Sequence, residues 1–283
     1  MEFPDGFATL ADRYDGFILD LWGVVHDGVR PLPGAVDCLE RLRRAGKRSV
    51  LLSNAPRRSG AAQEAMRAMG IPDALYDGIL TSGEMTRILL ERRDDPFFAK
   101  LGRRVFHLGP MRDKNVIEGL DVTEVGTPAE ADFVLNTGPD DHRSPTSMEP
   151  FEDTLRACRL AGLPMVCANP DLEVIRGGER VLCAGSLAAR YVELGGRARL
   201  IGKPDPAVYG PVLEMLGVAP ARVLAVGDAL RTDIAGATAT GLASCWVLGG
   251  IHGEALNGDR SAARDAAARA GFAPVAAIPA FAW

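Results

Sequence analysis

Short hydrophobic runs alternate with longer stretches of helical spacing along most of the chain. The run GFILDLWGVV at 16–25 is followed by AVDCLERLRRAG at 35–46, where hydrophobic residues recur with helical spacing until a glycine ends the segment. A second run, RSVLLSNAP at 48–56, is followed by a helix-like segment at 57–70. Such alternation is typical of parallel strands joined by helices, so the pattern predicts an α/β fold with a parallel sheet.

The rest of the chain continues this alternation. A short strand and a helix are expected over 76–93, and Ser82 is a candidate cap for that helix. Further strands are predicted over 103–110, 131–139, 164–171, 222–228 and 243–250, and helices within 140–162 and over 207–217 and 233–241. The segments 185–196 and 198–206 lie between these elements and are assigned to neither type. The last 26 residues, from position 258, are predicted to form an alanine-rich helix and a loose end.

Composition narrows the class of protein. Of the 283 residues 47% are hydrophobic and 24% are charged, which is ordinary for a globular chain of one large or two modest domains. The net charge of −5 gives no basic surface for nucleic acid. No apolar run approaches the roughly 20 residues that span a bilayer. Five cysteines without a C-x-x-C pair suggest buried thiols in a reducing compartment. We therefore expect a cytoplasmic protein without nucleic-acid or membrane partners.

Polar side chains follow four of the predicted strands directly. They are Asp20, Ser53, Asn169 and Asp228, and Lys203 lies between the third and the fourth. Taken singly, each is more often a turn or cap residue than a functional one. In open parallel sheets, however, ligands bind beyond the carboxyl ends of the strands. The ordered set therefore predicts a site at that edge of a sheet.

Two kinds of group in this set suit phosphoryl transfer. Such a reaction needs an oxygen nucleophile and a divalent cation. Asp20 can attack phosphorus and also bind Mg²⁺, a hard ion that prefers carboxylates and water. Asp228 can supply a second carboxylate, and Asp233 can orient the water molecules bound to the metal.

The transferred phosphoryl group also needs hydrogen-bond donors and a positive charge. Ser53 and the backbone N–H groups around Asn54 can donate to the phosphate oxygens. Lys203 can neutralise both the nucleophile and the transferring group.

Four segments resemble, in order, the four motifs of the haloacid dehalogenase (HAD) superfamily. They are DLWGV at 20–24, LLSNAP at 51–56, IGKPDP at 201–206 and VGDALRTDIAG at 226–236. The flanking segments GVVHDGVRPLPGA, ILTSGE, CANPD and GKPDPAVY are similar to the class IIA branch, the NagD-type sugar and nucleotide phosphatases. The resemblance extends over nearly the whole chain, from about Phe17 to Gly250.

The resemblance implies a fold and a site. The fold is a Rossmann-like core with a parallel sheet, at 1–84 and 200–283, and an inserted α/β cap domain of the C2 type at 85–199. The reaction passes through an aspartyl phosphate on Asp20. The resemblance implies that Asp20, Asp228 and the main-chain carbonyl of Trp22 bind Mg²⁺. It implies that Ser53, Asn54 and Lys203 bind the phosphate. On the substrate side, it implies Asn169 and Asp171.

Trp22 departs from the family pattern. The usual motif has a second aspartate two residues after the nucleophile, which protonates the leaving oxygen and later activates water. The indole N–H does not titrate near neutral pH. Three explanations remain open. In the first, His26 or Asp27 carries the proton. In the second, the leaving group needs no acid, as in an acyl phosphate or an enol phosphate. In the third, the chain binds a phosphorylated ligand and turns it over slowly.

Taken together, the residues and the resemblance predict a Mg²⁺-dependent phosphatase for a small phosphorylated metabolite such as a sugar phosphate or nucleotide. The rival is a weakly active or non-catalytic protein that binds a phosphorylated ligand, for which Trp22 is the argument. A metal-free dehalogenase would leave Asp228 and Asp233 as buried carboxylates without a counter-ion, which is costly. Relatives of class IIA often dimerise, so a homodimer is compatible with the resemblance.

Overall fold

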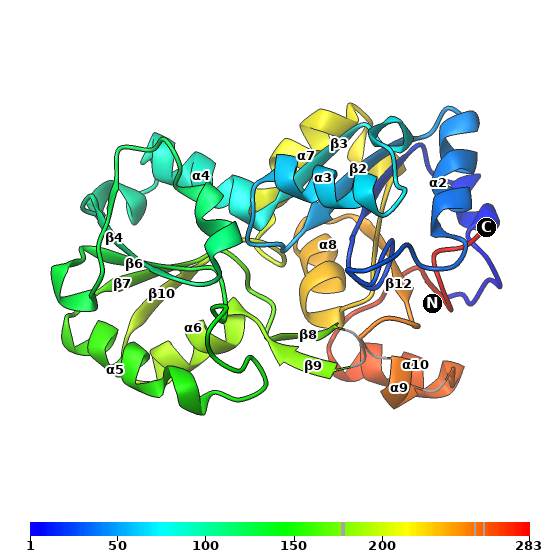
Figure 1. Ribbon diagram of the computed structural model, residues 1–283. Coiled ribbons are helices and arrows are strands. Elements are labelled where there is room, and N and C mark those ends of the chain that lie inside the picture. The colour runs from blue at the N-terminus through cyan, green and yellow to red at the C-terminus, as the bar shows by residue number, and fades with distance from the viewer. Residues whose placement is uncertain (177–178, 252, 257) are drawn as a thin grey trace. The chain divides into compact units, whose positions relative to one another are not determined.

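The chain divides into two compact units in the computed structural model, which describes residues 1–176, 179–251, 253–256 and 258–283 (Figure 1). Unit 1 comprises Met1–Ser53, Gln63–Leu80 and Lys203–Trp283, and unit 2 comprises Asn54–Ala62 and Thr81–Gly202. The sequence-based division changes domain after residues 84 and 199 and places 54–62 in the core. The structure groups that short segment with unit 2.

Unit 1 is built on a six-stranded sheet with the order β13-β12-β11-β1-β2-β3. The strands are β1 (Gly16–Leu19), β2 (Arg48–Ser53), β3 (Gly78–Thr81), β11 (Val223–Gly227), β12 (Ala243–Val247) and β13 (Ala276–Ile278). Pairing is parallel from β13 through to β2. The two central strands, β1 and β11, are buried at every position, which explains their unbroken hydrophobic sequences. The predicted α/β fold with a parallel sheet is confirmed.

Helices connect these strands, as parallel pairing requires. They are α1 (Ala8–Ala11), α2 (Ala35–Arg44), α3 (Ser59–Ala68), α7 (Tyr209–Leu216), α8 (Ala235–Ala239), α9 (Gly253–Leu256) and α10 (Arg260–Arg269), with 3₁₀ turns η1 (Asp73–Leu75), η6 (Pro206–Val208) and η7 (Pro220–Arg222) and a π-helical segment η8 (Leu230–Ile234). Helix α7 packs on β1 and β2, α2 packs on β2, and α8 packs on β12.

The C-terminal segment is not the loose end that the sequence suggested. Strand β13 pairs with β12, and its three residues are buried. The Phe281 ring packs edge-on against Phe7, with the ring centroids 4.9 Å apart. The prediction was wrong because β13 is short and contains two alanines, so neither its length nor its composition marks it as a strand.

Unit 2 has its own five-stranded parallel sheet, with the order β10-β7-β6-β4-β5. Its elements are α4 (Ser82–Arg92), η2 (Phe98–Lys100), β4 (Arg104–Leu108), η3 (Met111–Val116), β5 (Thr123–Glu124), η4 (Pro128–Glu130), β6 (Phe133–Asn136), η5 (Glu149–Phe151), α5 (Glu152–Leu160), β7 (Pro164–Cys167), α6 (Ala184–Glu193) and β10 (Arg197–Leu200). An antiparallel hairpin, β8 (Glu173–Arg176) with β9 (Glu179–Leu182), was not predicted.

Both faces of the unit 2 sheet are covered. Along β6, Phe133 and Leu135 join a hydrophobic cluster with Leu90 of α4, whereas Val134 joins a cluster with Leu155 of α5 and residues of α6. Alternate residues of a strand point to opposite faces, so this division follows directly from the strand geometry.

The cap of α4 is one residue earlier than expected. The Thr81 hydroxyl accepts a hydrogen bond from the Glu84 backbone N–H at 3.1 Å, so Thr81 is the N-cap. Ser82 is the first helical residue, and its hydroxyl donates to the Asn54 side-chain oxygen instead. Threonine and serine are both preferred at the N-cap, so the sequence alone does not tell which of the two precedes the first helical residue.

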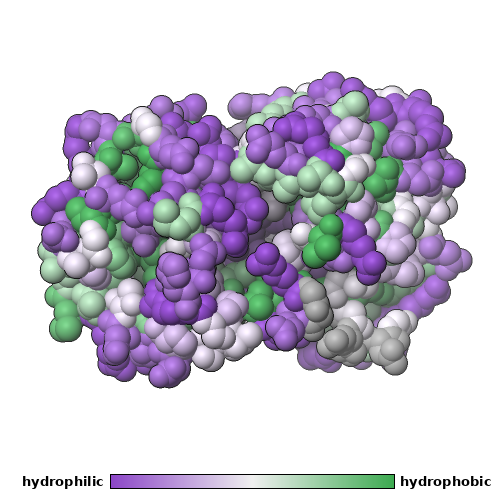
Figure 2. Space-filling model, in the orientation of Figure 1, coloured by the Kyte–Doolittle hydropathy of each residue, from purple (hydrophilic) through white to green (hydrophobic). Residues whose placement is uncertain are grey.

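Surface features give little information about partners. No helix formed by the described residues is both long and apolar enough to cross a bilayer. On the face shown in Figure 2, most of the surface is hydrophilic. Large exposed hydrophobic side chains occur in both units, among them Val29 and Trp283 in unit 1 and Leu160 and Val192 in unit 2. The cytoplasmic location and the homodimer stay predictions.

Candidate active site

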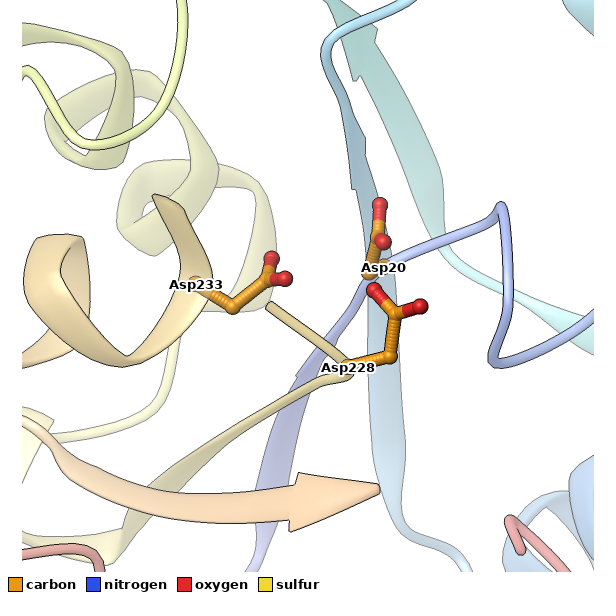
Figure 3. Close-up of side chains that lie close together, drawn as sticks. All are labelled: Asp20, Asp228 and Asp233. Carbon is orange, nitrogen blue, oxygen red and sulfur yellow. The ribbon is translucent and has the colours of Figure 1, made fainter. Parts of the chain in front are cut away.

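Three neighbouring strands of unit 1 bring polar residues to one edge of its sheet. Asp20 follows β1, Asp228 follows β11, and Ser53 is the last residue of β2. The strand order β11-β1-β2 makes these ends adjacent. The side chain of Asp233, from η8, points toward Asp20 and Asp228 (Figure 3). The prediction that strand ends would bring carboxylates together agrees with this geometry for the residues of unit 1.

Lys203 joins two of the carboxylates. Its Nζ donates to Asp20 Oδ1 at 2.6 Å and to Asp233 Oδ1 at 2.7 Å, and its side chain is almost fully buried. Burial alone would lower the pKa of this ammonium group. The charges of Asp20 and Asp233, and their hydrogen bonds, outweigh burial and raise the pKa of Lys203 above its usual value. Lys203 is therefore a permanent positive charge beside Asp20.

The acidic residues outnumber this single cation. Carboxylate oxygens of Asp20, Asp228 and Asp233 all lie within 4.8 Å of one another. Burial, and then the charges of Asp20 and Asp233, raise the pKa of Asp228 well above its usual value. With all three carboxylates ionised, Lys203 balances one negative charge and leaves two. A hard divalent cation matches both the remaining charge and the oxygen donors.

Glycine makes room for Asp228. Gly23 has a positive φ of 78°, and a Cβ atom there would stand 2.1 Å from Asp228 Oδ2. A Cβ atom on Gly250 would stand 2.0 Å from the same oxygen. The Ile251 backbone N–H donates to this oxygen at 2.7 Å. Sequence reasoning did not single out these two glycines, although Gly23 lies within the motif DLWGV and Gly250 ends the predicted strand at 243–250.

The predicted substrate-side residues lie together in unit 2. The Asn54 Nδ2 donates to Asp171 Oδ1 at 2.8 Å, and the Asp171 backbone N–H donates to Asn169 Oδ1 at 2.9 Å. Asn54 Oδ1 accepts the Ser82 hydroxyl at 3.2 Å. These bonds fix the orientation of the Asn54 side chain within unit 2. The substrate-binding roles of Asn54, Asn169 and Asp171 stay predictions.

Trp22 lies against the turn that follows β1. A Cβ atom on Gly28, whose φ is 86°, would stand 2.2 Å from Cη2 of Trp22, so the ring rests on the Gly28 backbone. The His26 ring meets the indole edge-to-face, with the centroids 5.8 Å apart. The indole therefore packs into the turn and leaves position 22 without a titratable group.

His26 and Asp27, the predicted proton carriers, both hold this turn together. His26 Nδ1 accepts the Gly28 backbone N–H at 3.0 Å, which assigns the proton of the neutral ring to Nε2. Asp27 Oδ1 accepts the backbone N–H groups of Arg30 and Val29, each at 2.9 Å, and these bonds lower the pKa of Asp27. These structural roles count against either side chain as the acid that protonates a leaving group.

The excess negative charge leads to a prediction for Asp228→Asn. We expect the metal-free variant to unfold at a higher temperature than the metal-free wild type, because the substitution relieves repulsion and keeps an oxygen for the Ile251 N–H. Each kcal/mol gained corresponds to about 2–4 °C. Added Mg²⁺ should stabilise the wild type far more than the variant. Thermal unfolding with MgCl₂ and with chelator measures both effects. A less stable variant with an undiminished response to Mg²⁺ would contradict the assignment.

Comparisons with known proteins identify the family of this chain. A haloacid dehalogenase-like hydrolase model matches residues 17–123, and a HAD-hydrolase-like model matches residues 200–272. Chronophin from Homo sapiens is 30% identical over 253 residues, which cover 84% of this chain and 82% of chronophin.

Two solved structures extend the comparison. A hydrolase of the haloacid dehalogenase-like family from Brucella suis 1330 has a TM-score of 0.83 and 35% identity, covering 98% of this chain and 99% of that one. A glycerol phosphate phosphatase from Mycobacterium tuberculosis, in complex with calcium, has a TM-score of 0.64 and 27% identity, covering 86% of this chain and 68% of that one. This chain belongs to the haloacid dehalogenase-like hydrolase family, as the resemblance to its class IIA branch indicated.

Proposed function

We propose that the protein is a Mg²⁺-dependent phosphatase for a small phosphorylated metabolite, such as a sugar phosphate or a nucleotide. The observation that carries the proposal is the buried cluster in which Lys203 bridges Asp20 and Asp233 beside Asp228. A relative named as a glycerol phosphate phosphatase, with calcium bound, supports both the substrate class and the divalent metal.

Asp20 is the proposed nucleophile. A carboxylate oxygen of Asp20 forms a bond to phosphorus while the bond from phosphorus to the ester oxygen breaks, which gives an aspartyl phosphate and an alkoxide that takes up a proton from solvent water to leave as the alcohol. Water then attacks phosphorus, releases inorganic phosphate and regenerates the carboxylate. Lys203 holds Asp20 in place through Oδ1 and neutralises charge that develops during both steps.

The proposed metal site uses residues of the same cluster. Asp20, Asp228 and the main-chain carbonyl of Trp22 would hold Mg²⁺, and Asp233 would orient its water molecules. The bound ion would neutralise phosphoryl oxygens and so favour attack by an anionic nucleophile. Ser53 and the Asn54 backbone N–H are the proposed donors to the phosphate, and Asn169 and Asp171 are proposed to face the substrate.

Trp22 supports a second candidate function, a weakly active or non-catalytic protein that binds a phosphorylated ligand. The family's aspartate at this position typically contributes about 10²–10⁴-fold as a general acid and base. The nearest candidate replacements, His26 and Asp27, are bonded into the turn.

Phosphate release from a panel of phosphorylated metabolites, with Mg²⁺ and with chelator, tests the proposal. Metal-dependent release that is lost in Asp20→Asn is the expected result. No release from any compound, together with metabolite binding detected by thermal shift, would favour the binding protein.

A further inference from the structure

Trp246 connects the core of unit 1 to the residues at the carboxyl edge of its sheet. The residue lies in β12 and is fully buried, and its indole N–H donates to the main-chain carbonyl of Asp228 at 2.9 Å. A leucine, an isoleucine or a phenylalanine can also fill a buried position, but none of them carries a side-chain donor. The hydrogen bond is therefore a property of the indole that hydrophobic packing alone does not require.

The peptide group between Asp228 and Ala229 is held on both sides. Its carbonyl accepts the Trp246 N–H, and its own N–H, which belongs to Ala229, donates to Asp233 Oδ2 at 3.1 Å. Rotation of this peptide plane would disturb both hydrogen bonds at once. The two bonds also polarise the peptide group in the same direction, so each strengthens the other. The indole thus acts on Asp228 and on Asp233 through one peptide group.

The same hydrogen bonds continue to the proposed nucleophile. Asp233 Oδ1 accepts a hydrogen bond from Lys203 Nζ at 2.7 Å, and this ammonium group donates to Asp20 Oδ1 at 2.6 Å. Four hydrogen bonds therefore lead from Trp246 to Asp20 by way of the peptide group, Asp233 and Lys203. All the residues of this chain of bonds belong to unit 1.

Packing places the indole beside the segment that carries Asp233. Trp246 is in register with Gly227 of β11, and a Cβ atom on Gly227 would stand 2.1 Å from Asp233 Cγ. The ring shares a hydrophobic cluster with Leu230 and Ile234 of η8. The ring therefore contributes to the core, whereas the N–H fixes the peptide group, and a substitution that keeps a ring can separate the two contributions.

We propose that Trp246 is a positioning residue, whose indole N–H fixes the peptide group between Asp228 and Ala229 and so raises the affinity of the site for Mg²⁺. The inference rests on the proposed function for the roles of Asp228 as a metal ligand and of Asp233 beside it. Side chains that are held in place before the ion arrives lose less conformational entropy when it binds.

Titration of the metal-free protein with MgCl₂, followed by calorimetry, tests the inference without turnover. Trp246→Phe keeps an aromatic ring and removes the N–H, and we expect the Kd for Mg²⁺ to rise about 10- to 100-fold, as for other hydrogen-bond partners behind metal ligands. In the metal-free variant, hydrogen exchange at the Ala229 amide should also be faster, because its peptide group has lost one of the bonds that hold it.

Cys245→Ala is a matched control. Cys245 precedes Trp246 on β12, is fully buried and points to the opposite face of the sheet. The control should lower the unfolding temperature and leave the Kd for Mg²⁺ unchanged. If Trp246→Phe does not fold, replacement of Trp246 by β-(3-benzothienyl)alanine, which has sulfur in place of the N–H and nearly the same shape, gives the same comparison. An unchanged Kd without the N–H, or an equal rise in Cys245→Ala, would overturn the inference.

The outcome remains separable from that of the proposed function. Mg²⁺-dependent hydrolysis of 4-nitrophenyl phosphate by the wild type, with an unchanged Kd for Mg²⁺ in Trp246→Phe, would remove the role of Trp246 and leave the phosphatase. Mg²⁺ binding that weakens in Trp246→Phe, without any hydrolysis by the wild type, would remove the phosphatase and leave the role of Trp246. A wild type that binds no Mg²⁺ would remove both.

Discussion

Asp20→Asn is expected to abolish phosphate release, with a loss of at least about 10⁴-fold in turnover. The amide cannot act as the nucleophile, although it keeps the shape of the side chain and an oxygen that can accept the Lys203 hydrogen bond. Lys203 also keeps its ion pair with Asp233, so the fold should survive. Phosphate release with Mg²⁺, and acid trapping of a labelled phosphoprotein, measure the effect.

Asp37→Asn is a matched control for Asp20→Asn. Asp37 lies on α2, pairs with Arg41 at the surface and is half exposed, so its removal should leave turnover unchanged. Phosphoprotein should form in the control and not in Asp20→Asn. Turnover retained in Asp20→Asn would refute the nucleophile assignment.

Trp22→Asp is expected to raise turnover of alkyl phosphates by up to about 10²–10⁴-fold, the usual contribution of a general acid and base. The substitution restores the family's titratable group two residues after the nucleophile. An aryl phosphate such as 4-nitrophenyl phosphate should gain much less, because its leaving group departs without protonation. The ratio of kcat/KM for an alkyl and an aryl phosphate, measured in both proteins, tests this expectation.

Trp22→Phe separates acid–base chemistry from loss of the indole. It keeps an aromatic ring against Gly28 and supplies no proton, so the alkyl-to-aryl ratio should stay close to that of the wild type. A gain in both variants would attribute the effect to removal of the indole. A loss in Trp22→Asp would show that the site depends on the indole packed against His26 and Gly28.

Much of the core could be predicted because its signals are local. Central strands such as β1 and β11 are continuous hydrophobic runs, and parallel pairing places the residues that follow them at one edge. Asp20 and Asp228 were found in this way, without knowledge of the strand order. Strand β13 escaped prediction because its alanines carry little strand preference.

Other features depend on contacts between distant positions. Arg57 and Arg58 are the same residue type in adjacent positions, and only the folded chain shows that Glu84 satisfies one of them and leaves the other beside the buried Asp113. The fit of Gly23 and Gly250 around Asp228 likewise needs three separate segments to be folded. No spacing rule in a single sequence contains that information.

The division of the chain has a consequence for exchanging parts between relatives. The chain passes from one unit to the other four times, after Ser53, Ala62, Leu80 and Gly202. Transplanting 81–202 alone would leave Glu84 without Arg58 and Asp171 without Asn54, since both partners belong to the short segment 54–62. Substrate preference should therefore be transferred between relatives only when 54–62 and 81–202 are exchanged together. A chimera that receives 81–202 alone would combine this segment with a 54–62 segment from another protein, which need not supply the partners of Glu84 and Asp171.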